Sequence, residues 1–126
     1  MKEMLVKLLN NSYAPISGTS VACIVKMKDG TLFKGVNVEN PSFKSGLCAE
    51  QVAIGRAISA GYKNKNFDSI YIMDDSNSFI EPCFLCRQYF VDLFDESVKI
   101  VLLTMDGKEK VYSMDELCPH PFRMEN

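Results

Sequence analysis

The chain has 126 residues, of which 47% are hydrophobic and 24% charged, and these values suit one ordered globular domain spanning residues 1–126. No run approaches the roughly 18 apolar residues of a membrane span, and the start is too charged for a secretory signal, so we expect a cytoplasmic protein without membrane contact. A formal net charge of -2 without a Lys/Arg cluster argues against a nucleic-acid partner and favours a small free substrate.

The first half of the chain predicts a short helix, a hairpin and a longer helix. Apolar residues at helical spacing predict a helix over residues 4–9. Two strands are expected over 21–27 and 32–38, and the Asp-Gly pair between them is a strong signal for an antiparallel hairpin. A second helix is expected over 48–60, which places Cys48 at a helix start.

The second half of the chain predicts alternating strands and helices. We expect a strand over 69–73, a helix over 83–95, a buried strand over 100–103, a short strand at 111–112 and a last helical turn over 113–116. Strand, helix and strand in succession imply a parallel crossover. The predicted fold class is therefore α/β, a three-layer α/β/α domain with a mixed five-stranded sheet that is antiparallel at one edge.

Three cysteines form a pattern typical of a zinc site. Five cysteines is an odd number, and cytoplasmic thiols stay reduced, so metal binding or catalysis explains them better than a set of disulfides. If the expected boundaries hold, Cys48, Cys83 and Cys86 cluster at the N-terminal ends of two neighbouring helices, where partial positive charge favours thiolates. Three protein ligands leave one tetrahedral position of Zn²⁺ open for water, whereas a structural zinc site closes all four.

Glu50 follows Cys48 by two residues, so it need not bind the metal yet can reach its bound water. Zinc lowers the pKa of that water toward about 7, and Glu50 is expected to move protons during hydrolytic loss of an amine. Taken alone, Glu50 could also be a first-turn acid that complements the helix dipole. Cys23 lies in an apolar run and is expected to be an inert buried thiol, while His120 stays an alternative fourth ligand.

Several segments spread over almost the whole chain agree with one family of enzymes. They are Cys48-Ala49-Glu50, Pro82-Cys83 with Cys86-Arg87-Gln88, Tyr13-Ala14-Pro15, the run from Gly35 to Asn40, and Glu116 to Pro119. Together these segments resemble the small homotetrameric zinc-dependent cytidine deaminases. The resemblance implies one Zn²⁺ per subunit and hydrolysis of cytidine and deoxycytidine to uridine and deoxyuridine plus ammonia, as in pyrimidine salvage.

The same resemblance implies how a free nucleoside is bound. Asn37 and Glu39 match the residues that hydrogen-bond the ribose hydroxyls, and the backbone around Ala49 matches the part that meets the pyrimidine. Phe122 matches a late Phe that stacks on the base from a neighbouring subunit, which links activity to a homotetramer. Without the resemblance, Asn37 and Glu39 would be interpreted as polar positions of an edge strand.

Three positions depart from the family pattern. Gln51 stands where the family commonly has an Arg that hydrogen-bonds the thiolates. Gln51 can donate hydrogen bonds but not charge, so we expect charge compensation from Arg87 and the helix ends. Thr19 stands where many relatives place a Phe against the substrate, and Phe84-Leu85 replaces a frequent Gly-Ala pair between two of the cysteines.

Four alternatives remain open at this point. A deaminase of a modified nucleoside such as blasticidin S shares the cysteine motifs, although the segment from Asn37 to Asn40 favours plain nucleosides. A polynucleotide editor is disfavoured because such enzymes pair His with the catalytic Glu and need a basic channel. The other two alternatives are an inactive zinc-stabilised scaffold, against which Glu50 argues, and a thiol redox module built on Cys83 and Cys86.

Overall fold

The computed structural model describes residues 1–42 and 45–124. Its elements, in chain order, are α1 (Lys2–Leu9), β1 (Val21–Met27), β2 (Leu32–Val36), α2 (Ala49–Ser59), the short 3₁₀ helix η2 (Asn64–Asn66), β3 (Phe67–Asp74), α3 (Phe84–Leu93), β4 (Lys99–Leu103), β5 (Glu109–Tyr112) and α4 (Met114–Leu117). Of these helices, none has the length and hydrophobicity needed to cross a membrane.

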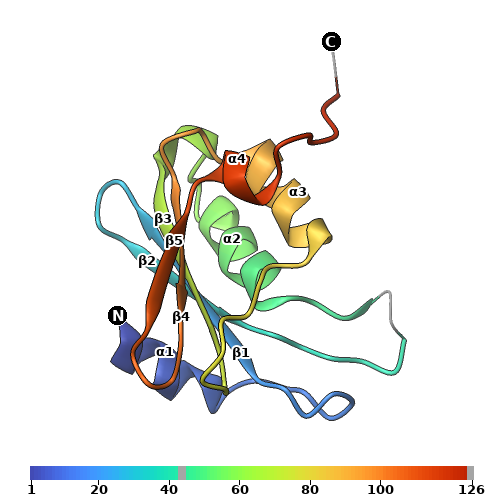
Figure 1. Cartoon of the computed structure of the whole chain (residues 1–126). Coiled ribbons are helices and arrows are strands. Elements are labelled where there is room, and N and C mark those ends of the chain that lie inside the picture. Colours follow the sequence, from blue (N-terminus) through green and yellow to red (C-terminus); the bar gives the residue numbers. More distant parts are fainter. Residues whose placement is uncertain (43–44, 125–126) are drawn as a thin grey trace.

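The five strands form one mixed sheet in the order β2-β1-β3-β4-β5 (Figure 1). β3 and β4 are parallel, and every other neighbouring pair is antiparallel. The predicted α/β class, the mixed five-stranded sheet and the hairpin are thus confirmed. The parallel pair arises because β3 is followed by a crossover through α3 before the chain returns as β4, as the strand, helix and strand pattern predicts.

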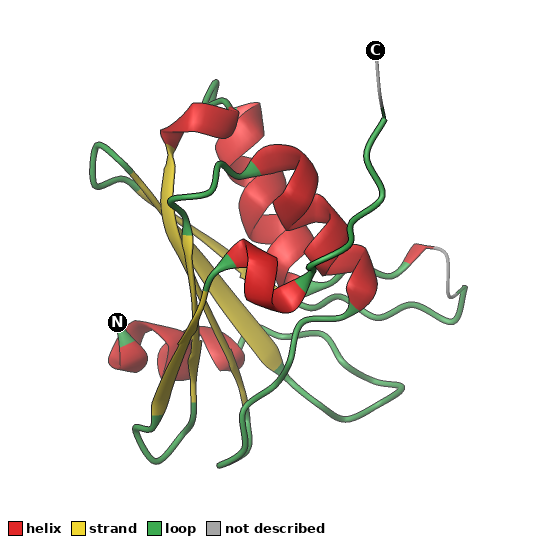
Figure 2. Ribbon diagram, turned by 45° about the horizontal axis from the view of Figure 1, so that its top comes forward, coloured by secondary structure: helices red, strands yellow, loops and turns green. Residues whose placement is uncertain are grey.

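Helices cover both faces of the sheet (Figure 2). α1 packs on one face, where Leu5 and Leu9 meet Ala22 and Ile24 of β1. α2, α3 and α4 lie on the other face, where alternate β1 residues such as Cys23 belong to the larger hydrophobic core. β1 is buried on both faces because successive side chains of a strand point to opposite sides. The predicted three-layer arrangement is therefore confirmed, and the larger core lies under the helices that carry the cysteines.

β2 ends at Val36, two residues earlier than the sequence predicts, because an asparagine side chain enters the ladder. The Asn37 backbone N–H donates to the Val21 carbonyl at 3.2 Å, but the Val21 N–H donates to Asn37 Oδ1 at 2.9 Å instead of the Asn37 carbonyl. That carbonyl accepts from the Tyr13 N–H at 3.1 Å. The chain therefore leaves β1 at this point and turns toward the helix that begins after Cys48.

Gly35 brings β2 and α2 into backbone contact. A Cβ at this glycine would lie 2.4 Å from the Ala49 carbonyl oxygen and 2.5 Å from the Ala53 nitrogen. No side chain other than hydrogen leaves room for so close an approach. Gly35 thus fixes where the first turn of α2, which follows Cys48, rests on the sheet.

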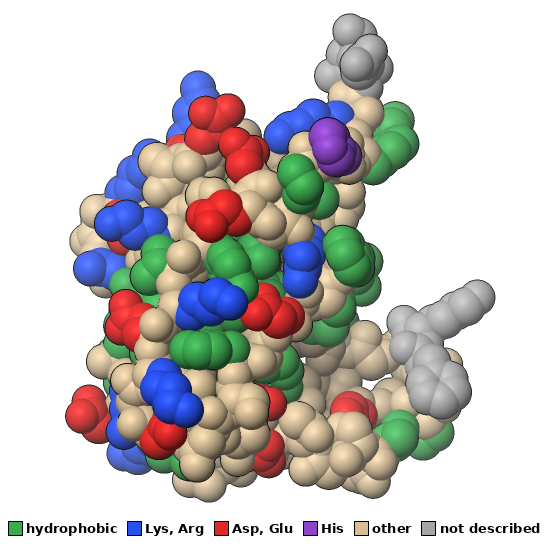
Figure 3. Space-filling model, viewed as in Figure 1, with side chains coloured by type: hydrophobic (Ala, Val, Ile, Leu, Met, Phe, Trp, Pro, Cys, Tyr) green, Lys and Arg blue, Asp and Glu red, His purple; other side chains and the backbone are tan. Residues whose placement is uncertain are grey.

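The charged side chains are mixed on the face of the molecule that Figure 3 shows. Lys and Arg are interspersed there with Asp and Glu rather than gathered into one continuous basic patch (Figure 3). Three ion pairs are formed among the described residues, Lys28 with Asp95, Lys108 with Asp106, and Lys110 with Glu81. All three are largely exposed, so each contributes little to stability.

Candidate active site

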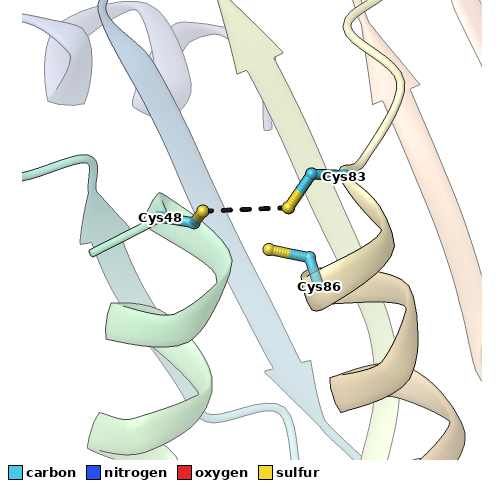
Figure 4. A group of neighbouring side chains, drawn as sticks. All are labelled: Cys48, Cys83 and Cys86. Carbon is cyan, nitrogen blue, oxygen red and sulfur yellow. Dashed lines mark hydrogen bonds between the residues drawn. The ribbon is translucent and has the colours of Figure 1, made fainter. Parts of the chain in front are cut away.

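Three cysteine thiols converge where α2 and α3 begin (Figure 4). Cys48 is the N-cap residue of α2, Cys83 is the N-cap of α3, and Cys86 lies in the first turn of α3. The three sulfurs lie within 4.8 Å of one another, and the Cys48 and Cys83 sulfurs are 4.0 Å apart. The parallel crossover produces this meeting because it sets α3 beside α2 with both helices starting at the same end of the sheet.

The donor set fits zinc. Zn–S bonds of about 2.3 Å at tetrahedral angles separate two sulfurs by about 3.8 Å, close to the spacing of Cys48 and Cys83. The Cys86 thiol donates toward Cys48, which lowers the pKa of Cys48 to about 7 and raises that of Cys86. The pKa of Cys48 therefore lies near neutrality, and a bound divalent cation would favour the thiolate form of all three cysteines.

Glu50 lies in the first turn of α2 and lines a cavity that Cys48 and Cys83 also line. Only 5% of this residue is exposed, and burial raises the pKa of its carboxyl above the usual value. A carboxyl whose pKa moves toward neutrality is better suited to accept and return protons near pH 7. The buried thiol of Cys23 lies on the strand beneath, where burial likewise raises its pKa, in line with the predicted inert role.

Gln51 and Arg87 bond to main-chain atoms around the metal-binding turns. Gln51 Oε1 accepts from the Cys48 N–H at 2.9 Å, so the amide supports the backbone of the first cysteine rather than a sulfur. Arg87 Nε donates to the Pro82 carbonyl and Nη1 to the Leu117 carbonyl, both at 2.8 Å. The guanidinium of Arg87 thus joins the turn before Cys83 to the C-terminal part of the chain, a contact that no spacing in the sequence signals.

A cavity of about 560 Å³ opens beside the cysteines. Its lining residues include Ile16, Ser17, Asn37, Glu39, Ala49, Glu50, Glu81 and Cys83. The structure therefore brings Asn37, Glu39 and Ala49, the sugar-binding and base-binding candidates of the sequence analysis, into one cavity with Cys48 and Cys83. Thr19 meets this group through its main chain: its carbonyl accepts from Asn37 Nδ2 at 2.8 Å, and its N–H donates to the Ser17 hydroxyl at 3.0 Å.

Phe122 lies apart from this cavity. It sits on the C-terminal segment after α4, and 67% of it is exposed. Its carbonyl accepts from Gln88 Nε2 at 2.8 Å, which ties the segment to α3. Within one chain, the main chain at Phe122 is therefore attached to α3, but Phe122 does not line the cavity.

Asn37 and Glu39 accept hydrogen bonds from the segment between α1 and β1, a contact that the sequence analysis did not predict. Asn37 Oδ1 accepts from the Ser12 hydroxyl and from the Val21 N–H. Glu39 Oε1 accepts from the amides of Ile16 and Ser17 at 3.0 and 2.9 Å, and Oε2 accepts from the Ser17 hydroxyl. The only signals in the sequence are the turn-forming proline and glycine nearby, which do not indicate a partner 22 residues away.

The chain matches known deaminases along its length. Residues 1–102 match the family described as the cytidine and deoxycytidylate deaminase zinc-binding region. A protein of Mycoplasma genitalium named cytidine deaminase is 31% identical over 121 residues, covering 96% of this chain and 92% of that protein. A Bacillus cereus protein named blasticidin-S deaminase is 31% identical over 107 residues, covering 79% and 74%.

The fold agrees with the sequence relatives. A crystal structure of cytidine deaminase from Burkholderia pseudomallei superposes with a TM-score of 0.90 at 34% sequence identity, covering 95% of this chain and 94% of that one. The matched region contains all three cysteines and Glu50. The chain therefore belongs to the zinc-binding family of cytidine and deoxycytidylate deaminases.

Proposed function

We propose that the protein hydrolyses the amino group of cytidine and deoxycytidine, giving uridine or deoxyuridine and ammonia, with one Zn²⁺ per chain held by Cys48, Cys83 and Cys86. The observation that carries this proposal is a cluster of three thiols, two of which, Cys48 and Cys83, line one cavity with the buried Glu50 and with Asn37 and Glu39. Zinc bound by the thiolates acts as a Lewis acid that activates water as a nucleophile near neutral pH.

Glu50 is the proton carrier of this reaction. Its carboxylate takes a proton from the attacking water and delivers it to the ring nitrogen N3, which makes C4 a better electrophile. It then takes the remaining proton of the added water and returns it to the departing amino nitrogen, so that ammonia leaves and a carbonyl forms at C4. Both transfers suit one buried carboxyl that lines the same cavity as the zinc ligands Cys48 and Cys83.

Spare hydrogen-bonding capacity on Asn37 and Glu39 supports recognition of a single sugar hydroxyl. Asn37 uses both lone pairs of Oδ1 and one N–H of Nδ2 within the described residues, which leaves one N–H. Glu39 accepts three hydrogen bonds there, which leaves one acceptor position on Oε2. One hydroxyl can accept from the first and donate to the second. Such a hydroxyl is present in both ribose and deoxyribose, so we expect both nucleosides to be substrates.

The charge of the cavity favours a free nucleoside over a nucleotide or a polymer. Glu39, Glu50 and Glu81 line it, and no Lys or Arg is found among its described lining residues. A phosphate group would meet carboxylates without a compensating cation. The mixed surface charge in Figure 3 is likewise unlike the basic stripe of a nucleic-acid channel.

Assembly and location complete the proposal. We place the whole activity in one domain over residues 1–126 that works in the cytoplasm, where its five free thiols stay reduced. The backbone around Ala49 meets the pyrimidine, and the exposed Phe122 stacks on the base held by a neighbouring subunit in a homotetramer. The exposed side chains of Phe84, Leu85 and Phe122 support this because a subunit interface would bury them.

The experiment measures zinc and turnover on one preparation. Protein purified without chelator should contain one zinc per chain and should convert cytidine with the accompanying ultraviolet change. Glu39→Ala should lower kcat/KM for cytidine at least about tenfold at unchanged zinc content, because a sugar hydroxyl loses its charged acceptor. Absence of zinc together with absence of turnover would refute the proposal.

The second candidate is deamination of blasticidin S, which the similarity to the Bacillus cereus protein favours. Its discriminating test is a direct comparison of kcat/KM for cytidine and for blasticidin S. A higher value for blasticidin S would replace cytidine as the substrate while leaving the zinc chemistry in place. A higher value for cytidine would reject this candidate.

A further inference from the structure

A tight turn before β1 presents two successive amides to the carboxylate of Glu39. The Gly18 N–H donates to the Ala14 carbonyl at 3.0 Å, and Gly18 adopts a positive φ of 73°, which favours glycine. Within this turn, the N–H groups of Ile16 and Ser17 both donate to Glu39 Oε1. Successive amides in a turn form a small anion-binding concavity, and Glu39 occupies it.

Ser17 also engages the second oxygen of the same carboxylate. Its hydroxyl donates to Glu39 Oε2 at 2.5 Å and accepts from the Thr19 N–H at 3.0 Å. Ser17 is therefore the one residue that donates to both oxygens of Glu39 among the contacts of the described chain. These bonds, that of the Ser17 hydroxyl foremost, hold the pKa of Glu39 below its usual value, so the carboxylate is ionised when substrate arrives.

The hydrogen bonds to both oxygens fix the orientation of the Glu39 carboxylate. Two amides on Oε1 alone would leave the group free to tilt about that oxygen, whereas a third donor on Oε2 removes this freedom. The remaining acceptor position on Oε2 then points in one direction only. Ser17 and Glu39 both line the cavity that Cys48, Cys83 and Glu50 also line.

We propose that Ser17 is a positioning residue for substrate binding, which aims the free acceptor of Glu39 at the sugar hydroxyl of the nucleoside. This inference rests on the proposed function, since it needs Glu39 to bind the sugar. It assigns Ser17 a role in selecting substrates that carry that hydroxyl, and no role in the chemical step at the base. A serine that merely competed with the sugar for Oε2 would have the opposite effect on affinity.

The test compares cytidine with 2′,3′-dideoxycytidine, which lacks the 3′-hydroxyl, the ring hydroxyl that ribose and deoxyribose share and that we assign to Glu39. In Ser17→Ala, the ratio of kcat/KM for cytidine to kcat/KM for dideoxycytidine should fall about tenfold, and the loss on cytidine should appear mainly in KM. Ser17→Thr keeps a hydroxyl and should restore most of that ratio. The value of kcat for cytidine should stay close to that of the wild type in Ser17→Ala, because the variant leaves Glu50 and the three cysteines unchanged.

Three outcomes would overturn the inference. They are a gain in kcat/KM for cytidine in Ser17→Ala, an equal loss with both nucleosides, or a Thr variant no better than the Ala variant. Glu39→Ala separates this failure from that of the proposed function. If Glu39→Ala retains wild-type kcat/KM for cytidine, the sugar-binding proposal itself is wrong. If Glu39→Ala is impaired and Ser17→Ala keeps the wild-type ratio, only the role of Ser17 is wrong.

Discussion

Replacing Gly35 with alanine is expected to push α2 off the sheet and to loosen the metal site with it. The added Cβ would lie 2.4 Å from the Ala49 carbonyl oxygen and 2.5 Å from the Ala53 nitrogen, whereas ordinary contacts begin at 3.4 Å. Both partners are main-chain atoms, so no side-chain rotation can relieve the overlap. The backbone of α2 must therefore move by about 1 Å relative to β2.

The cost follows from the size of that movement. Overpacking typically destabilises by about 1–3 kcal/mol, and a backbone overlap belongs at the upper end, which lowers Tm by about 10 °C for a chain of this size. α2 also carries Cys48 and Glu50, and a zinc ligand tolerates only about 0.2 Å of error in its distance. We therefore expect weaker zinc retention against a chelator and a loss in kcat of about 10²-fold.

The matched control is Gly55→Ala in the same helix. A Cβ at Gly55 meets nothing within 4 Å, so alanine should stabilise α2 by about 0.5–1 kcal/mol through its higher helix propensity. Thermal unfolding, zinc titration and cytidine turnover are measured on both variants. A Gly35→Ala protein with the Tm and zinc affinity of the wild type would refute the close-packing argument.

Three further variants test the parts of the site. Glu50→Gln should keep zinc and Tm but lower kcat by about 10²–10⁴-fold, and a kcat within tenfold of wild type would contradict its role as proton carrier. Cys86→Ala should lose zinc and stability together, whereas Cys118→Ala, outside the thiol cluster, should keep its zinc; equal zinc content in both would reject the ligand set. Arg87→Lys should lower stability by about 2–3 kcal/mol because lysine cannot reach both carbonyls. Its control is Arg56→Lys, with one carbonyl bond on an exposed residue, which should cost less than about 1 kcal/mol, and similar Tm values would show that the double contact is unimportant.

Local patterns were sufficient to predict the frame of the fold. β1 spans Val21–Met27 as predicted, because its apolar run and the following Asp-Gly turn leave few alternatives. The thiol cluster could also be anticipated, since Cys48 and the Cys83–Cys86 pair each stand at a helix start and a parallel crossover brings such starts together. Both features depend on which residue types follow one another at short spacing, and this can be taken directly from the sequence.

Contacts between distant segments could not be predicted in the same way. β2 stops early because the side chain of Asn37 takes a ladder position that a backbone carbonyl would normally fill. The contact of Ser17 with Glu39 joins an irregular turn to the end of a strand, and neither segment has a periodic pattern. Likewise, the hydrogen bonds of Arg87 to two main-chain carbonyls could not be predicted, and its expected compensation of the thiolate charge stays a prediction. Such choices depend on which polar groups remain unpaired once the backbone is in place.

The anchoring of the C-terminal segment has a consequence for how this part of the chain can diverge. Arg87 and Gln88 bind the carbonyls of Leu117 and Phe122, and every residue type supplies a carbonyl. Substitutions between these two positions can therefore accumulate without breaking the attachment to α3. The side chain at position 122 can change while the main chain there stays attached to α3, so the position of this segment is inherited independently of the group it carries.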